Sequence, residues 1–135
     1  MKSFKDIPDN YYVSKDDSNS MIYVPVPMSL ICSEEFRFLS DTAKLLYGVL
    51  FCRLNMSRNN NLCDDKHRLY VYMTISEVMT TFGVGQTKAK AMFRELSDIG
   101  GKGIGLIVKK RIGNQSSRIY VLHCKEVLKV LQRMK

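Results

Sequence analysis

Several features that would place this chain in a common protein class are absent from its 135 residues. No apolar run approaches the roughly 20 residues that a membrane-spanning helix needs. The opening segment Met1–Asp6 lacks the apolar stretch of a secretory signal peptide. We therefore expect a soluble, cytoplasmic protein without a membrane partner.

The cysteines lack the spacing that a metal site or a disulfide framework requires. They are Cys32, Cys52, Cys63 and Cys124, and no C-x-x-C pair occurs. Cys63 and His67 come nearest to the spacing of a zinc pair, but no second pair completes four ligands. A reducing cytoplasm also disfavours disulfides. These observations predict free thiols and no metal or other cofactor.

Enzyme motifs are missing as well. The Gly100–Gly105 stretch superficially resembles a phosphate-binding loop, but it follows a helical pattern and Lys102 precedes glycine instead of Ser or Thr. His67 and His123 have no carboxylate or nucleophile at catalytic spacing, and the Asp64–Asp65 pair is expected to be solvated. We predict that the chain is not an enzyme and that its glycine-rich stretch is a flexible connector.

What the chain does contain is enough material for one domain and a large excess of positive charge. Hydrophobic residues make up 45% and charged residues 25%, which is ordinary for a globular protein. The net charge is +8, and residues 85–135 alone hold twelve basic and three acidic residues. Such an asymmetry predicts a polyanionic partner, although charge alone does not distinguish DNA, RNA and anionic lipid.

The N-terminal residues indicate an arm ahead of the domain. Residues 1–21 are mostly polar and are predicted to be a flexible N-terminal arm, interrupted by the apolar segment Tyr11–Val13. Residues 22–27 contain two prolines, which predict an edge strand or extended arm. Because an extended apolar edge favours pairing with another chain, we expect Ile22–Ile31 to assist self-association.

A helix and a strand are predicted in the middle of the chain. Ser40 is a suitable cap for a helix that ends near Leu54, because apolar residues recur at helical spacing between them. Ser57–Asn61 is predicted to be a polar loop. Leu69–Met73 is rich in aromatic and β-branched residues and predicts a short strand.

Residues 74–98 have the pattern of a helix-turn-helix. Thr74 and Glu77 match a capping box at the start of a two-turn helix, and Gly83 can supply the left-handed residue that ends it. Gly85 is an acceptable cap for a second helix that runs to about Asp98. Taken without further context, an ordinary helical hairpin with a solvated charged face is the more common explanation.

A basic hairpin after these helices favours a winged helix. Gly105–Ile112 and Arg118–His123 are predicted strands joined by a turn at Gly113–Ser117, and they can pair with the Leu69–Met73 strand. Lys125–Lys135 places its apolar residues on one face of a last helix. The order of elements predicts an α+β fold, a winged helix-turn-helix DNA-binding domain with a small antiparallel sheet, over residues 22–135.

In such a fold the second helix enters the major groove of DNA and the wing reaches the minor groove or the backbone. The candidate DNA-binding residues are Gln86, Thr87, Lys88, Lys90, Arg94, Lys109, Lys110, Arg111, Asn114, Gln115 and Arg118. Arg94 and Lys90 can reach guanine edges or phosphates. For Lys109 and Lys110 simple solvation is an equally good explanation, and Arg118 can instead pair with a carboxylate.

A set of motifs in a defined order narrows the assignment. The most specific is the Leu-Ser-x-x-Ala-Lys-Leu-Leu-Tyr run at residues 39–47. Tyr23–Pro25 precedes it, and Leu69–Tyr72, Arg94–Leu96 and Arg118–Val121 follow it. Over residues 22–121 the chain resembles the N-terminal domain family of plasmid replication initiator protein A.

This resemblance implies a winged-helix domain from an initiator of theta-replicating plasmids in Gram-positive bacteria. Members of the family bind double-stranded DNA at repeated sites in the plasmid origin, usually as homodimers. A separate C-terminal domain engages the host replication proteins, so the resemblance implies that this chain, which ends after the first domain, lacks those contacts.

Two other interpretations stay open. A winged-helix transcriptional repressor would have the same fold, and only the location of its sites, over a promoter or in an origin, would distinguish it. A basic protein-interaction module would bind an acidic partner instead of DNA. Such a module would keep its binding after replacement of the DNA-facing residues of the second helix.

Overall fold

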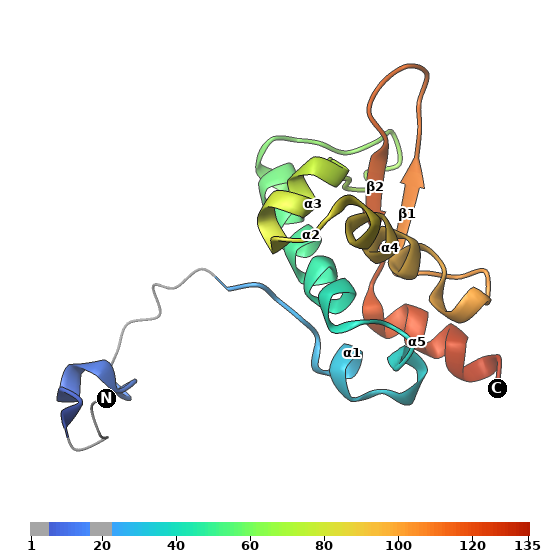
Figure 1. Ribbon diagram of the computed structural model, residues 1–135. Helices are drawn as coiled ribbons and strands as arrows, with labels where there is room; N and C mark the ends of the chain where they lie inside the picture. The colour runs from blue at the N-terminus through green and yellow to red at the C-terminus, as the bar shows by residue number, and fades with distance from the viewer. Residues whose placement is uncertain (1–5, 17–22) are drawn as a thin grey trace.

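A computed structural model describes residues 6–16 and 23–135 of the protein (Figure 1). Within these residues the helices are α1 (Met28–Cys32), α2 (Asp41–Asn59), α3 (Ile75–Phe82), α4 (Gln86–Ser97) and α5 (Cys124–Arg133). The strands are β1 (Ile107–Lys110) and β2 (Arg118–Val121), and the short 3₁₀ helices are η2 (Asp9–Tyr11), η3 (Glu34–Phe36) and η4 (Ile99–Gly101). The predicted α+β order, with a helix-turn-helix followed by a hairpin, is confirmed.

Helix α2 is the longest element of the described chain. Ser40 caps it as predicted, because its hydroxyl accepts a hydrogen bond from Ala43 N at 3.2 Å. The helix continues past its predicted end at Leu54. Ser57 is buried, and its carbonyl accepts from Leu62 N at 2.8 Å. Of the predicted loop Ser57–Asn61, residues 57–59 thus form the last turn of the helix, and Asn60 and Asn61 follow it as a turn.

Helices α3 and α4 form the predicted helix-turn-helix. The Thr74 hydroxyl accepts from Glu77 N at 3.0 Å and the Glu77 carboxylate accepts from Thr74 N at 3.1 Å, which completes the capping box. Gly83 ends α3 with φ of 64°, a left-handed conformation that suits glycine. Helix α4 starts after Gly85 and buries the apolar residues Ala89, Met92, Phe93 and Leu96.

The wing is a two-stranded hairpin. Its strands pair antiparallel with Ile107 opposite Val121, and both are shorter than predicted, so the loop between them spans residues 111–117. The predicted strand at Leu69–Met73 is wrong, because the segment forms two isolated bridges and no strand. One bridge joins Leu69 to Cys63, and in the other Val71 and Ile119 exchange backbone hydrogen bonds at 2.9 Å. The carbonyl of the next residue, Tyr72, accepts a hydrogen bond from the Arg53 guanidinium at 2.7 Å. The backbone pairing with β2 therefore does not continue beyond Val71.

The glycine-rich stretch ahead of the wing is a hydrogen-bonded turn that contains η4, and not the flexible connector that was expected. The Asp98 carboxylate accepts from Gly103 N at 2.7 Å. Gly105 is buried, and a Cβ atom there would collide with the backbone of Leu96 and Ser97. The missing side chain lets the wing start directly against the C-terminal end of α4.

The chain ahead of α1 is extended for only a few residues. Tyr23–Pro27 crosses α2, where a Cβ on Gly48 would meet the side chains of Val24 and Val26. Within the described residues this segment pairs with no strand. Because α1 follows at once, the extended arm predicted over Ile22–Ile31 is wrong for its second half, and residue 22 lies outside the described residues.

Helix α5 packs against the core through Val127 and Leu131, both of which are buried as their spacing predicted. Its start is joined to α2 by Tyr47, whose hydroxyl donates to Leu122 O at 2.7 Å and accepts from Cys124 N at 3.2 Å. Burial raises the pKa of Tyr47 to about 12, so the hydroxyl keeps its proton at neutral pH.

Residues 6–16 contain only the short helix η2. Tyr11 is 72% exposed and Val13 is 95% exposed, so this apolar segment is not part of the core. The remainder of the predicted arm, residues 1–5 and 17–21, lies outside the described residues. None of the helices in the described ranges is both long enough and apolar enough to cross a membrane.

Candidate nucleic-acid interface

The face of α4 opposite its buried stripe carries polar and basic side chains around the small, half-buried Ala91. The polar and basic residues are Gln86, Thr87, Lys88, Lys90 and Arg94, and all five are exposed. Gln86, Lys90 and Arg94 recur at intervals of four residues and so follow one side of the helix. In the described part of the chain none of the five has an ion-pair partner. These side chains are therefore available to an external ligand.

The N-terminus of α4 lies at the end of this face. Gly85 has no side chain to accept from the first turn, and that turn contains no acidic residue. The first backbone N–H groups of a helix have no partner inside the helix, and they suit an anionic acceptor such as a phosphate. The open turn therefore adds backbone donors to the side chains of Gln86 and Thr87.

Glu95 holds α4 in place through the capping residue of α2. Its carboxylate accepts from Ser40 N at 2.7 Å and from the Ser40 hydroxyl at 2.9 Å. This role of Glu95 was not predicted from the sequence. The available signal was that Glu95 is the single carboxylate in a helix whose other polar residues are basic or neutral. Glu95 positions the candidate interface and is not part of its exposed face.

Arg53 performs a similar task for α3 and was also missed. Its guanidinium donates to Glu77 Oε2 at 2.8 Å and to Tyr72 O at 2.7 Å. The Arg53 hydrogen bond, together with that of the Thr74 backbone, lowers the pKa of Glu77, so the capping box is held in its ionised form. The two helices of the helix-turn-helix are thus both attached to α2 by charged hydrogen bonds.

In the wing, Lys109 faces α4. Its ammonium lies 4.1 Å from the centroid of the Phe93 ring, an arrangement that favours a cation–π interaction. Burial lowers the pKa of Lys109. Because the Lys109 ammonium packs against the ring of buried Phe93, it lies beside the polar and basic face of α4.

Lys110 and Arg118 are directly paired in the hairpin and lie on its other face, because neighbouring residues of a strand alternate between faces. The Arg118 guanidinium lies 4.3 Å from the centroid of the Tyr70 ring, and its buried Nε has no hydrogen-bond partner. A side-chain interaction with Tyr120 raises the pKa of Arg118. Arg118 has no carboxylate partner among the described residues, so the alternative expected from the sequence is wrong.

The remaining candidates lie in the loop of the hairpin. Arg111, Asn114 and Gln115 are exposed. Gly113 has φ of 59°, which gives the loop a left-handed position where glycine is favoured. Figure 1 shows the loop projecting from the helical body at the end opposite α5. These three side chains are therefore available to a ligand that approaches the tip of the wing.

In the acidic pair at residues 64–65, Asp65 is exposed as expected, but Asp64 differs from expectation. The Asp64 side chain is only 6% exposed, and it accepts from the backbone N–H groups of Lys66 and Arg68 at 2.9 Å and from Arg68 Nε at 2.8 Å. Burial would raise the pKa of Asp64, but these hydrogen bonds and one from Tyr120 lower it below its usual value. Asp64 is thus a structural acceptor and is not solvated.

Metal-binding groups are not assembled in the described residues. All four cysteines are free thiols. No three His, Cys, Asp or Glu side chains of the described ranges are grouped as metal ligands would be.

Comparison with known proteins places this arrangement in a family. Residues 22–133 match the family model described as the replication initiator protein A (RepA) N-terminus. The chain belongs to this family. The match covers the helix-turn-helix, the wing and α5, and it extends beyond the residues 22–121 over which the sequence motifs indicated the resemblance. No curated protein matches the chain at a significant level.

Three solved structures share the fold of this replication initiator protein A domain. They are described as "N-Terminal domain of DNA binding protein", "Structure of Rep-DNA complex" and "Structure of MDR initiator". Each is 20% identical in sequence, with TM-scores of 0.65, 0.63 and 0.63. The similarity covers 92%, 92% and 91% of this chain and 95%, 95% and 97% of the others. The domain architecture is therefore shared over nearly the whole chain.

Proposed function

We propose that this domain binds double-stranded DNA in a sequence-specific manner, at repeated sites in a plasmid replication origin. The observation that carries the proposal is the exposed face of α4, whose polar and basic side chains have no ion-pair partner in the described structure. A recognition helix needs such donors to read base edges in the major groove. Family membership supports the role of a replication initiator over that of a transcriptional repressor.

The side chains of α4 have different expected roles. Arg94 and Lys90 are placed to donate to guanine or to phosphates, and Gln86 suits an adenine edge. Thr87 can contact a thymine methyl group or a phosphate, and Lys88, at the side of the stripe, suits a phosphate. The open first turn of α4 supports a phosphate contact at the same end of the helix.

The wing is proposed to contact the DNA backbone or the minor groove beside α4. A DNA duplex that lies along α4 would approach the side of the hairpin next to α4 and the tip of the hairpin. Lys109 lies on that side, and the tip carries Arg111, Asn114 and Gln115. Lys110 and Arg118 lie on the opposite face of the hairpin. We expect these two to contact DNA only where the duplex bends around the wing.

The domain is further proposed to act in the cytoplasm as a homodimer, with host replication proteins engaged through a separate C-terminal domain. Tyr23, Met28 and Ile31 near the start of the domain are 58%, 70% and 56% exposed, and such apolar side chains are suited to contact a second copy. Sedimentation analysis with and without DNA tests the dimer. A monomeric mass at high protein concentration under both conditions would contradict it.

The first test is a salt titration of binding to two duplexes of equal length. One carries the tandem repeats of the origin of the plasmid that encodes the protein, and the other carries the same bases in scrambled order. A preference of about 10³ or more for the repeats is expected of a specific DNA-binding protein. Equal affinities with a steep salt dependence would mean that only phosphates are recognised, and the origin-binding proposal would be wrong.

Arg94→Ala tests the reading of bases by α4. We expect a loss of about 1–3 kcal/mol on the repeat duplex, a smaller loss on scrambled duplex and a relaxed base preference, because a guanine contact is removed. Arg37→Ala removes an exposed arginine outside the interface and is the matched control. Equal losses on both duplexes would make Arg94 a phosphate contact. A variant in which Gln86, Thr87, Lys90 and Arg94 are all replaced provides the wider test. If it still binds an acidic protein partner with full affinity, the protein-interaction module is favoured.

A further inference from the structure

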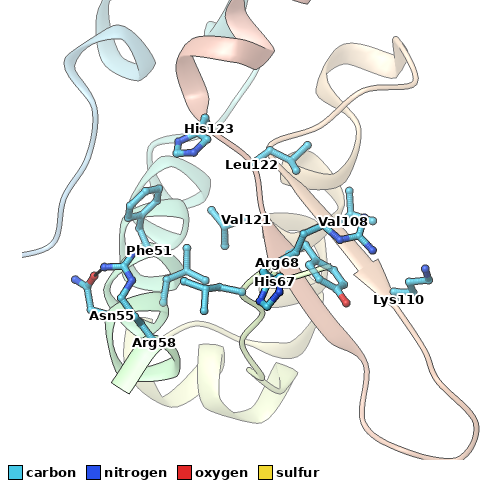
Figure 2. A pocket seen from close by; sticks show the side chains of 13 residues that line it. Phe51, Asn55, Arg58, His67, Arg68, Val108, Lys110, Val121, Leu122 and His123 are labelled. Atoms are coloured by element: carbon cyan, nitrogen blue, oxygen red, sulfur yellow. Dashed lines mark hydrogen bonds between the residues drawn. The ribbon is translucent and has the colours of Figure 1, made fainter. Parts of the chain in front are cut away.

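A cavity of about 440 Å³ lies on the face of the hairpin that points away from α4 (Figure 2). Val108 and Lys110 of β1 contribute to it, whereas Lys109 between them packs against Phe93 of α4. The other walls come from the C-terminal half of α2, from residues 67–69, from Tyr120 and Val121 of β2, and from the chain between β2 and α5. The cavity therefore lies apart from the α4 face of the candidate DNA interface, and Lys110 is the one candidate DNA-binding residue among those that line it.

The walls of this cavity are mainly apolar. Phe51 and Leu54 of α2, Leu69, Val108 of β1, and Val121 and Leu122 supply them. Val108 is 46% exposed, so the apolar surface is open to solvent on this side. Pockets for small ligands have volumes of roughly 300–1,000 Å³, with apolar walls and a few polar groups that fix orientation. The cavity has the size and the lining of such a pocket.

The polar groups of the cavity are cationic or neutral. Arg58, Arg68, Lys110 and two histidines line it, and no Asp or Glu does. Arg68 is neutralised by Asp64 at 2.8 Å, whereas Arg58 and Lys110 have no ion-pair partner among the described residues. Figure 2 shows Arg58 and Lys110 on opposite sides of the opening, with His67 drawn between them. An occupant with negative charge would find partners at this rim.

We propose that this cavity binds a small amphipathic organic anion, with an apolar body held between α2 and the hairpin and an anionic group at the Arg58 side. The apolar body of the ligand would pack against the apolar walls, and its anionic group would pair with the cations that have no ion-pair partner. The volume of about 440 Å³ is in the range of small-molecule pockets, whereas a peptide helix needs an elongated groove for its i, i+3, i+4 and i+7 side chains. The site goes beyond DNA binding, because ligand and DNA approach opposite faces of the hairpin.

The test uses two probes with the same ring system. 1-Anilinonaphthalene-8-sulfonate carries a sulfonate, and N-phenyl-1-naphthylamine is its uncharged counterpart. Binding to the full chain is followed by probe fluorescence and by the amide NMR shifts of the protein. We expect saturable binding of one sulfonate probe per chain, with shifts centred on Leu69, Val121 and Leu122. The uncharged probe is expected to bind more weakly at the same place.

Arg58→Gln separates charge recognition from apolar binding. Arg58 is exposed, so this variant is expected to fold normally. We expect it to weaken binding of the sulfonate probe roughly two- to fivefold, the range for a solvent-accessible ion pair, and to leave binding of the uncharged probe unchanged. Arg133→Gln makes the same change of net charge at an exposed position of α5 and should alter neither affinity.

A second variant, Val108→Trp, fills the cavity and should abolish saturable binding of both probes while the unfolding midpoint stays near that of the original protein. The proposal is overturned by NMR shifts centred elsewhere, by equal effects of the Arg58 and Arg133 variants, or by equal affinity for the two probes. Each of these results would assign the binding to general surface charge or to apolar contact alone. None of them depends on DNA binding, so the outcome does not affect the proposed function.

Discussion

At the level of single residues, two carboxylates stabilise parts of the fold that the proposed interface needs. Glu95 joins α4 to the capping residue of α2, and Asp64 organises the turn that leads to the Val71–Ile119 bridge. Glu95 accepts two hydrogen bonds from half-buried Ser40, whereas the Asp64 carboxylate, itself 6% exposed, accepts from exposed Lys66 and Arg68 and from the hydroxyl of buried Tyr120. Because a buried donor without its acceptor is costly, removal of either carboxylate should be more harmful than removal of a surface charge.

Glu95→Ala tests the first of these carboxylates. Ser40 N and the Ser40 hydroxyl lose their acceptor, and we expect the free energy of unfolding to fall by about 1–3 kcal/mol. Urea denaturation measures this change. The control is Glu126→Ala, which removes an exposed carboxylate of α5 whose one ion-pair partner among the described residues is Lys129 at 3.4 Å, and it should change stability by less than about 0.5 kcal/mol. Equal effects of the two variants would contradict a positioning role for Glu95.

Asp64→Asn tests the second carboxylate through its pH dependence. The folded state lowers the pKa of Asp64, so the ionised carboxylate stabilises the fold at every pH above its unfolded value of about 3.9. This stabilisation is lost as the pH falls through the lower folded pKa. The variant should therefore melt at a lower temperature than the original protein at neutral pH, and the difference should shrink below about pH 4.

Asp65→Asn is the neighbouring control for that experiment, because Asp65 is exposed. It should leave the melting temperature nearly unchanged at neutral pH. A difference between the Asp64 variant and the original protein that stays constant into the acid range would show that the carboxylate charge is not the stabilising feature.

At the level of elements, the candidate interface depends on how closely the wing approaches α4. The Gly105 position makes this approach possible, since a Cβ atom would collide with the carbonyl end of α4. Lys109 then reaches the Phe93 ring from β1. The position of the hairpin is thus determined by one tight backbone contact at its start and by side-chain packing farther along.

Gly105→Ala should push β1 away from α4. We expect the free energy of unfolding to fall by about 1–3 kcal/mol, the usual cost of overpacking. We also expect weaker DNA binding, since the wing would no longer lie beside the recognition helix. Gly85→Ala is the control for stability, because nothing lies within 4 Å of a Cβ at that position and φ there is −81°. A Gly105 variant as stable as the Gly85 variant would contradict the tight contact.

At the level of the whole molecule, the described structure separates two exposed surfaces on the two faces of one hairpin. The helix-turn-helix face has unpaired basic side chains and a helix N-terminus without a side-chain cap. The other face holds the cavity between α2 and the wing. The net charge of +8 should promote the encounter with DNA over long distances, whereas the local geometry of α4 should determine which bases are read.

The boundary between arm and domain remains a prediction at this scale. Removal of residues 1–21 should change the free energy of unfolding by less than about 0.5 kcal/mol, because the described side chains of the Tyr11–Val13 segment are exposed. Thermal or urea unfolding of the shortened chain measures this. A larger loss of stability would mean that the arm contributes to the folded domain.

The local features of the fold could be predicted because their causes lie within a few residues. The Ser40 cap, the Thr74–Glu77 capping box and the left-handed Gly83 all depend on partners three or four positions away. The buried stripe of α4 follows from helical periodicity in the same way. The motifs at residues 39–47 identified the family for a related reason, since they are contiguous in the chain.

Only the tertiary structure decided the features that join distant segments. The Glu95–Ser40 hydrogen bonds span 55 positions, and the hydrogen bond that Asp64 accepts from the Tyr120 hydroxyl spans 56. The register of β1 and β2 decided that Lys109 faces α4 while Lys110 and Arg118 face the cavity side. Composition shows that the wing is basic. Because neighbouring side chains of a strand point to opposite faces, strand pairing and packing determine which of these basic side chains can contact DNA.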